Sequence, residues 1–370
     1  MKKINKPSIL LSLIICITFY RCESPTTPPL EISDWQLGTF KKLNDKNPVL
    51  GLIDSTLFFC PILETDVAWE AKDVFNPTAI VVNDTLFMLY RAEDSVGRYN
   101  GTSRIGIAWS LDGTTFHRDS KPILYPDNDS YKKYEWEGGI EDPRIVATDE
   151  GFVITYSSYE GKTARLCVAS SSNLRNWEKH GPVFSGEWVN LWSKAGSIVS
   201  DYSTGSPVAK LINGQYWMYW GDTDIFLATS DDLIHWSPLV DSDKELIKIL
   251  SPRKNMFDSR LVESGPPAMF TEKGIVLLYN GMNLDPSSDG DPELKEGTYS
   301  GGQALFDRED PTQLVDRTSE YFITPDQSYE IVGQIGNVCF IEGLVKYKGN
   351  WWLYYGTADS KIAVAVVTED

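Results

Sequence analysis

The sequence predicts an all-β protein, a single five-bladed β-propeller spanning residues 36–370. Two observations predict it. Five pairs of short apolar segments are each separated by a tight-turn signal, so each pair is typical of a strand–turn–strand hairpin. A further strand-like segment follows the hairpin, and the pattern recurs about every sixty residues, enough for the few short strands of one propeller blade. The second strands of the five hairpins are TLFMLY (85–90), FVITY (152–156), QYWMYW (215–220), IVLLY (275–279) and WWLYY (351–355).

The third element of the repeat ends in an Asp or Asn turn. It reads AWSLD (108–112), ASSSN (169–173) and ATSDD (228–232). We expect these Asp and Asn side chains to be structural, because an Asx side chain caps its own turn. The last repeat begins near Glu342 and is too short for four strands. An N-terminal strand within residues 36–58 is therefore expected to complete it and close the ring, which would otherwise leave sheet edges exposed.

The N-terminal segment predicts export. A basic start is followed by an apolar run too short for an ordinary membrane anchor, so residues 1–22 are expected to be a signal peptide. Cys22 at the end of this run resembles a bacterial lipoprotein site, although Arg21 stands where a small residue is usual; plain secretion is the alternative. Residues 23–35 are rich in Pro, Ser and Thr and are expected to form a tether. The chain is thus predicted to be an exported, periplasmic or cell-surface lipoprotein.

Composition and charge exclude some classes of binding partner. The net charge of −18 is spread along the chain, which argues against nucleic acid or an anionic membrane surface and leaves the lipid anchor as the membrane contact. Beyond the signal, Cys60, Cys167 and Cys339 have no metal-type spacing and are expected to be buried thiols. We expect no metal and no cofactor, and a neutral small molecule as the partner. The sequence says nothing about oligomeric state.

In a propeller the first strand of each blade lines the central channel, so the residues that open these strands meet around one axis. They are Asn76-Pro77, Asp142-Pro143, Ser206-Pro207, Pro266-Pro267 and Glu342-Gly343. The loops after the second strands return to the same end of the axis. They carry Arg91, Glu93, Asp94, Asp222, Asp224 and Asp359. The sequence therefore predicts a polar cup at one end of the channel.

Carboxylates in a cup with aromatic residues at its mouth, such as Trp136, Trp188 and Trp192, favour carbohydrate chemistry, because sugars stack on aromatic rings and offer hydroxyls to acids. Inverting glycoside cleavage needs a proton donor and a second carboxylate about 6.5 to 9.5 Å away that activates water. The repeat places Asp142, rather than Glu141, in register with Asn76.

These motifs resemble glycoside hydrolase family 130, the mannoside phosphorylases and β-mannosidases built on a five-bladed propeller. The matching stretches are VFNPTAI (74–80), LYRAED (89–94), RIGIAWSLDGTTF (104–116), GGIEDPRI (138–145), VESGPPAM (262–269) and YYGTADSKIAVA (354–365). The resemblance implies inversion of configuration, with Asp142 as the general acid and with Arg91 and Asp359 in contact with the mannose that is cleaved. The substrate-binding residues are then expected to be Asn76, Arg91, Glu93, Asp94, Glu141, Arg144, Lys194 and Asp359.

The sequence departs from the phosphorylases of that family at one place. They hold phosphate with basic residues that include a His-Arg pair, where this chain reads YWGDTD (219–224). Acids there would repel phosphate, so we expect hydrolysis of β-mannosides, with Glu263, Asp222 or both activating water. A phosphorylase of the same family and a non-catalytic sugar-binding propeller are the alternatives. A family 43-type glycosidase is disfavoured, because Asn76 stands where those enzymes carry their basic Asp. The linkage is not predicted.

Overall fold

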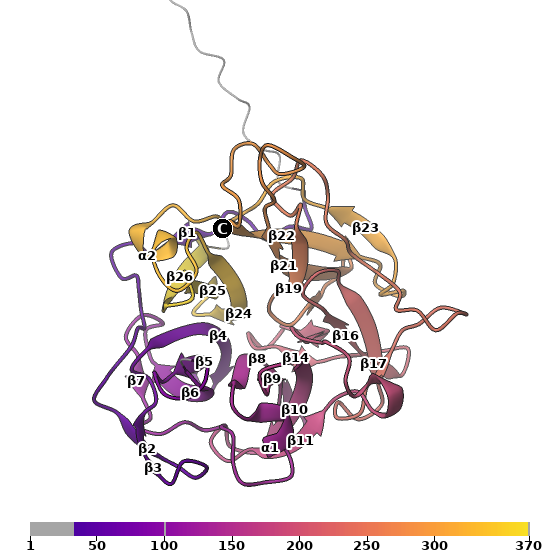
Figure 1. Cartoon of the computed structure of the whole chain (residues 1–370). Coiled ribbons are helices and arrows are strands. Elements are labelled where there is room, and N and C mark those ends of the chain that lie inside the picture. Colours follow the sequence, from indigo (N-terminus) through magenta and orange to yellow (C-terminus); the bar gives the residue numbers. More distant parts are fainter. Residues whose placement is uncertain (1–32, 100, 369–370) are drawn as a thin grey trace, which may run out of the picture. The chain divides into compact units, whose positions relative to one another are not determined.

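The computed structural model describes residues 33–99 and 101–368, and it is built almost entirely of strands and turns (Figure 1). The helices in the described part are short: α1 (Lys132–Glu135), α2 (Ser328–Ile331) and the 3-10 turn Gly186–Trp188. None of them is long and apolar enough to cross a membrane. The all-β prediction is confirmed. The predicted signal peptide, Cys22 and most of the predicted tether lie outside the described residues.

Within the described residues, the strands pair into five antiparallel units, numbered here in chain order. Unit one contains β4 (Asp73–Val82), β5 (Thr85–Glu93), β6 (Ser103–Ser110) and β7 (His117–Arg118). Unit two contains β8 (Gly139–Thr148), β9 (Gly151–Tyr159), β10 (Ala164–Ser171) and β11 (Glu178–Pro182). Unit three contains β12 (Ser197–Ile198), β15 (Leu211–Ile212), β16 (Gln215–Trp220), β17 (Phe226–Ser230) and β18 (Ser237–Pro238).

Unit four contains β19 (Leu261–Ser264), β20 (Met269–Phe270), β21 (Ile275–Met282), β22 (Tyr299–Phe306) and β23 (Leu314–Arg317). Unit five contains β24 (Cys339–Tyr347), β25 (Asn350–Thr357), β26 (Lys361–Thr368) and β1 (Lys41–Lys42). Two small hairpins lie outside these units. They are β2 (Leu57–Cys60) with β3 (Thr65–Ala68), and β13 (Ser200–Asp201) with β14 (Val208–Ala209). The first strands β4, β8 and β24 pack against one another, and Figure 1 shows them side by side.

The five predicted hairpins are all present, between β4 and β5, β8 and β9, β15 and β16, β20 and β21, and β24 and β25. Three of these turns use a left-handed residue pair, as at Asn83 (φ 49°) and Asp84 (φ 58°), which suits the twist of a two-residue hairpin turn. The expected N-terminal strand is also present, because β1 pairs with β26 through Lys41 and Val366. It supplies the fourth strand of unit five.

The prediction that Ser206-Pro207 opens the first strand of unit three is wrong. That strand begins at β12, where Ser197 pairs with Tyr219 of β16. The chain then leaves the sheet to form the β13–β14 hairpin and returns as β15. The Ser206 hydroxyl accepts the backbone N–H of Val81, at the other end of β4 from Asn76. The inserted hairpin resembles a channel strand in sequence, which explains the error.

Three first strands carry a β-bulge at the same end. The bulged residues are Asn76 on β4, Asp142 on β8 and Glu342 on β24. Asn76 and Asp142 have positive φ values of 46° and 49°. A bulge takes a residue out of the ladder and redirects its side chain. The predicted register of Asp142 with Asn76 is confirmed, and Glu342 joins them.

A buried acid, a tyrosine and a basic residue recur together in four units, and we call this group the strand clamp. The acid precedes the first strand, the tyrosine lies on the second strand of the unit's hairpin, and the base lies on the edge strand of the unit. The four clamps are Glu70–Tyr90–Arg118, Glu135–Tyr156–Lys179, Asp258–Tyr279–Arg317 and Glu330–Tyr355–Lys42. In unit three Tyr219 instead donates to the carbonyl of Pro311 at 2.9 Å. The Lys42 clamp ties the N-terminal strand to unit five.

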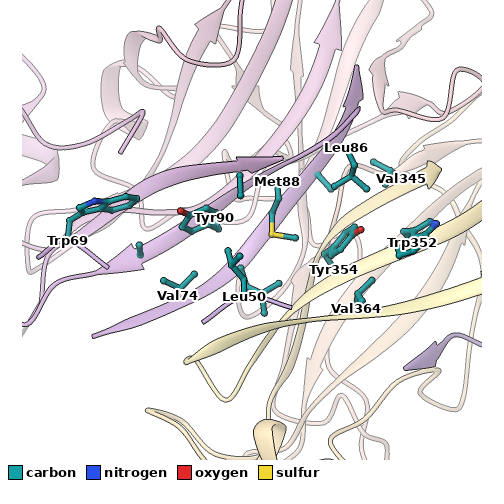
Figure 2. Packing of buried hydrophobic residues seen from close by; sticks show 14 of the residues in the cluster. Leu50, Trp69, Val74, Leu86, Met88, Tyr90, Val345, Trp352, Tyr354 and Val364 are labelled. Carbon is teal, nitrogen blue, oxygen red and sulfur yellow. The ribbon is translucent and has the colours of Figure 1, made fainter. Parts of the chain in front are cut away.

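Apolar cores lie between neighbouring units. Figure 2 shows Leu86, Met88 and Tyr90 of unit one packed with Trp352 and Tyr354 of unit five. The first and last units therefore share a core, although their sequences lie at opposite ends of the described chain. The three described cysteines are free and buried, as predicted.

Candidate active site

The Asp142 carboxylate is held by groups from three segments. Its Oδ1 accepts hydrogen bonds from Asn76 Nδ2 at 2.9 Å and from Arg91 at 3.1 Å. Its Oδ2 lies 3.5 Å from Lys194 Nζ. Asp142 is only 2% exposed, so these partners offset the cost of burying a charge. The structure thus brings together four residues that the sequence predicts for the site.

Arg91, near the end of β5, binds three acids at once. Besides Asp142, its guanidinium donates to Glu141 Oε1 at 3.0 Å and to Glu93 Oε1 at 2.8 Å. Its planar fork suits such multiple contacts, and it lies 4.7 Å above the ring of Phe75. Arg91 therefore neutralises acids supplied by β5 and β8.

Lys194 lies between Asp142 and Glu263, because its Nζ is 3.5 Å from Asp142 Oδ2 and 3.6 Å from Glu263 Oε1. Because the same Nζ atom contacts both oxygens, the carboxyl groups of Asp142 and Glu263 lie close together on either side of the lysine. Glu263 lies on β19 and is 3% exposed. Within the described part of the chain, its buried Oε1 has no hydrogen-bond partner. A buried acceptor of this kind is suited to bind water or a substrate hydroxyl.

The environment separates the pKa values of these two acids. Burial raises the pKa of Glu263 to about 7, and the favourable charge of Lys194 opposes the rise. Burial also acts to raise the pKa of Asp142, but Arg91, Lys194 and the hydrogen bond from Asn76 outweigh it and hold that pKa well below its usual range. Asp142 is therefore the acid of the two that ionises more readily, and Glu263 is the one that retains a proton more readily.

Asp359, in the loop after β25, is the third acid of unusual pKa. Burial raises its pKa to about 7, and Arg91 opposes the rise. Glu141 shows the same direction for the same reasons, since burial raises its pKa and Arg91 lowers it. Glu93 differs: burial is outweighed by Arg91 and Lys72, which lower its pKa to about 2. The site therefore contains acids of raised pKa, Asp359 and Glu141, beside an acid of lowered pKa, Glu93.

Arg144 and Asp94 make their contacts with protein groups. Arg144 donates to the backbone carbonyls of Gly265, Asp142 and Ser264 at 2.8, 3.2 and 2.8 Å, so it braces the bulge beneath Asp142. Asp94 accepts from Arg104 at 2.6 Å and from backbone N–H groups of its own loop. Both residues therefore support the site through contacts with other protein groups.

Glu342 lies beneath the site and was absent from the sequence-predicted set. It is fully buried, and its Oε1 is 3.0 Å from Arg144 in a geometry that makes an ion pair but no hydrogen bond. Burial raises its pKa well above the ordinary value, and Arg144 opposes the rise. The sequence did show that Glu342 opens the fifth first strand. Its register with Asp142 was the signal that could have included it.

Gln334 and Tyr299 were also missed. Gln334 Nε2 donates to Glu93 Oε2 at 2.9 Å and to the Asp359 carbonyl at 3.3 Å. Tyr299 begins β22, and its pKa is raised by burial and by the charge of Glu263. Both come from loops and strand ends that no motif marks, and only the folded chain brings them to the acids.

On the side of the site formed by unit three, the predicted mouth residue Trp192 donates its indole N–H to Asp222 Oδ2 at 2.9 Å. Asp224 pairs instead with Lys248 at 2.8 Å. Burial lowers the pKa of Lys194, but Glu263, Asp142 and Asp222 outweigh it and raise that pKa well above its usual value. The Asp222 carboxylate therefore acts on Lys194 through its charge and accepts a hydrogen bond from Trp192.

Comparisons with known proteins agree with this geometry. The family model described as beta-1,4-mannooligosaccharide phosphorylase, of glycoside hydrolase family 130, matches residues 57–370. The chain belongs to this family of mannoside-active enzymes.

Among the individual relatives, the chain is 31% identical to a 1,2-beta-oligomannan phosphorylase of Thermoanaerobacter sp. (strain X514), over 88% of this chain and 96% of the relative. It is 48% identical to a glycosyl hydrolase of Bacteroides ovatus of known structure, with a TM-score of 0.87 over 91% of this chain and 96% of the other. A second structure, also 48% identical over the same shares of both chains and with a TM-score of 0.88, is described with the statement that this family of mannoside phosphorylases contains glycoside hydrolases that target beta-1,2 mannosidic linkages in Candida mannan.

Proposed function

We propose that this protein is an inverting, exo-acting β-mannosidase that hydrolyses β-1,2-linked mannosides. The observation that supports hydrolysis most strongly is the charge pattern of the site. Its two central cations, Arg91 and Lys194, are each already paired with two or more carboxylates. A phosphate dianion would have to compete with those acids for the same cations. Water has no such competition, and the 48% identical relative described with β-1,2 hydrolysis supports both the reaction and the linkage.

In the proposed reaction, the oxygen of a water molecule attacks the anomeric carbon of the terminal mannose from one face. Glu263 takes a proton from that water, and the bond between the anomeric carbon and the leaving oxygen breaks. The leaving oxygen receives a proton from Asp142, directly or through a sugar hydroxyl. Arg91 and Asp359 hold the mannose, and Lys194 stabilises whichever of its two carboxylates is ionised at each step. After bond cleavage, Glu263 holds the proton taken from water, and Asp142 has lost the proton given to the leaving oxygen.

The charge balance explains how Asp142 can act although its pKa is low. Asp142 and Glu263 contact the same cation, and Glu263 has the higher pKa of the two, so near neutral pH a proton is held on Glu263 rather than on Asp142. The catalytically competent arrangement, with the proton on Asp142, is a minor form of the same singly protonated pair.

Phosphorolysis is the second candidate function, and the names of the curated relatives favour it. The 31% identical relative and a further one, 29% identical over 84% of this chain, are named phosphorylases that act on β-1,2-linked mannosides. Under this alternative, phosphate replaces water as the attacking group and Lys194 is the cation that receives it.

Incubation with β-1,2-mannobiose and β-1,4-mannobiose, each with and without phosphate, separates these candidates. Hydrolysis predicts free mannose at a rate independent of phosphate, with inverted anomeric configuration in the first minutes by NMR. Mannose 1-phosphate formed only when phosphate is present would establish the phosphorylase instead. Absence of cleavage under every condition, with retained mannobiose binding, would leave the non-catalytic sugar-binding propeller.

We propose further that the five antiparallel units are the blades of a closed five-bladed propeller over residues 36–370, which the β1–β26 pairing and the shared core of units one and five support. An electron-density map of the ring tests the number of blades. We also propose export as a lipoprotein through residues 1–22 and the 23–35 tether. Replacing Cys22 with Ala should then move the protein from the membrane fraction to the soluble fraction of the producing bacterium.

A further inference from the structure

Trp192 is exposed to solvent but anchored to the protein through its indole N–H. Its side chain is 49% exposed, yet its only polar atom is satisfied by Asp222 at 2.9 Å. The neighbouring residue Ser193 fixes the segment to β10, since its backbone N–H donates to the Ala164 carbonyl at 3.1 Å and its hydroxyl accepts the Leu166 N–H at 3.0 Å. The exposed ring is therefore held in a fixed orientation.

The same short segment carries Lys194 into the centre of the site. Lys194 contacts both Asp142 and Glu263, and its backbone carbonyl accepts the Gly221 N–H at 3.0 Å, next to Asp222. The ring, its anchor and the central lysine thus form one connected group. Trp188, by contrast, packs on the apolar core between units two and three. Of these two predicted mouth aromatics, Trp192 is the one linked to the acids.

A fixed, exposed indole next to a cluster of acids fits a pyranose ring, because the C–H face of a sugar stacks on an aromatic face while its hydroxyls reach polar groups. The acids around Arg91 lie on the unit-one and unit-two side, where the cleaved mannose is placed by the proposed function. The tryptophan is instead anchored by Asp222, whose charge acts on Lys194 and Glu263. The second sugar of the substrate, which leaves with the glycosidic oxygen, is the part of the substrate that remains for this ring to bind.

We propose that Trp192 is the stacking platform for the leaving sugar of the mannoside, and that Asp222 anchors this ring instead of activating water. This inference rests on the proposed function and sharpens it, because it leaves Glu263 as the base and assigns a leaving-sugar subsite. It also gives a role to the hydrogen bond that Asp222 Oδ2 accepts from the indole N–H.

The test compares two substrates in Trp192→Ala. One is β-1,2-mannobiose, whose leaving group is a sugar, and the other is β-mannosyl fluoride, whose leaving group is a single atom that cannot reach the ring. We expect kcat/KM to fall about tenfold on mannobiose, mainly through KM, and several-fold less on the fluoride. Trp192→Phe keeps an aromatic face and should retain most of the mannobiose activity. Equal losses on both substrates, or no loss on either, would overturn the platform.

Asp222→Asn tests the anchor separately. The amide oxygen still accepts the indole N–H but cannot take a proton from water, so an anchor predicts less than about a threefold loss on both substrates, whereas a base predicts at least about a hundredfold loss on both. Leu211→Ala is the matched control, because Leu211 on β15 is also 49% exposed and lies at the turn end of unit three. Thermal unfolding of each variant identifies a folding defect.

A failure of the proposed function gives a different result. If the wild-type protein cleaves no mannoside with water or phosphate, binding of mannobiose is measured by calorimetry. Weaker binding in Trp192→Ala but not in Leu211→Ala would still support the platform, and equal binding in all three proteins would refute it.

Discussion

Replacing Lys194 with Met is expected to move the alkaline limb of the pH–activity profile to higher pH. Lys194 Nζ lies 3.5 Å from Asp142 and 3.6 Å from Glu263, so its charge acts on both acids of this pair. The proposed reaction needs one proton on this pair, because one group donates a proton while the other accepts one. The wild-type pair keeps its last proton up to about pH 7, the pKa of Glu263, and loses it as the pH rises further.

The sign and size of the change follow from the contact. A positive charge beside Glu263 favours its ionised form and lowers its pKa, so removing that charge raises the pKa. Two unit charges about 4 Å apart in a partly buried site interact by about 4 kcal/mol, or about three pKa units. Arg144 and rearranged water offset part of this loss, so we expect a rise of at least about one unit. The ratio of activity at pH 8 to that at pH 6 should rise from about 0.1 to at least about 0.5.

The assay is kcat/KM for β-1,2-mannobiose, followed by mannose release from about pH 5 to about pH 9. Met retains the length of the lysine stem, so packing changes little, and thermal unfolding checks that the variant folds. The absolute rate is expected to fall as well, but the position of the limb is the decisive quantity. An alkaline limb that stays in place, or moves to lower pH, would show that Lys194 does not couple these acids.

The remaining predictions concern proton transfer and stability. Asp142→Asn should lower kcat on mannobiose by about 10² to 10⁴, but much less on β-mannosyl fluoride, because fluoride leaves without a proton. Glu263→Gln should lose activity on both substrates. If the two variants showed the opposite patterns, the roles of the two acids would be exchanged. Lys42→Met leaves Glu330 buried without its cation and should lower the free energy of unfolding by about 3 kcal/mol in urea. Lys210→Met, which removes an exposed pair with Asp201, should change it by less than about 0.5 kcal/mol, and equal effects would contradict the clamp.

The local part of the fold was predictable from sequence because its signals are local. Turn pairs such as Asn83-Asp84 demand left-handed backbone, and the structure has it there. Counting strands per repeat likewise predicted that an N-terminal segment would join the last unit, which β1 does. The first strand of unit three was misplaced, because the β13–β14 insertion around Ser206 has the composition of a channel strand and pairs elsewhere.

The site was predictable where strand register decides it and unpredictable where tertiary contacts decide it. The register of Asp142 with Asn76 followed from the repeat, and the two side chains are hydrogen-bonded. Whether an acid of the site is free to bind substrate or is already paired with a protein group depends on tertiary contacts. The Arg104 contact that occupies Asp94, and the burial of Glu342 against Arg144, leave no mark in the neighbouring sequence.

Every unit contributes to the charged cluster: Arg91 comes from unit one, Asp142 from unit two, Lys194 from the segment that enters unit three, Glu263 from unit four and Glu342 from unit five. The carboxylates of the proposed mechanism, Asp142, Glu263 and Asp359, come from different units, so their spacing is set by how neighbouring units pack. The strand clamps and the shared core of units one and five act on that packing. The geometry at the reacting atoms therefore depends on residues far from them in sequence. The bulge on β8 that redirects Asp142, for example, places that acid correctly only because the segment entering unit three supplies Lys194 as its cation.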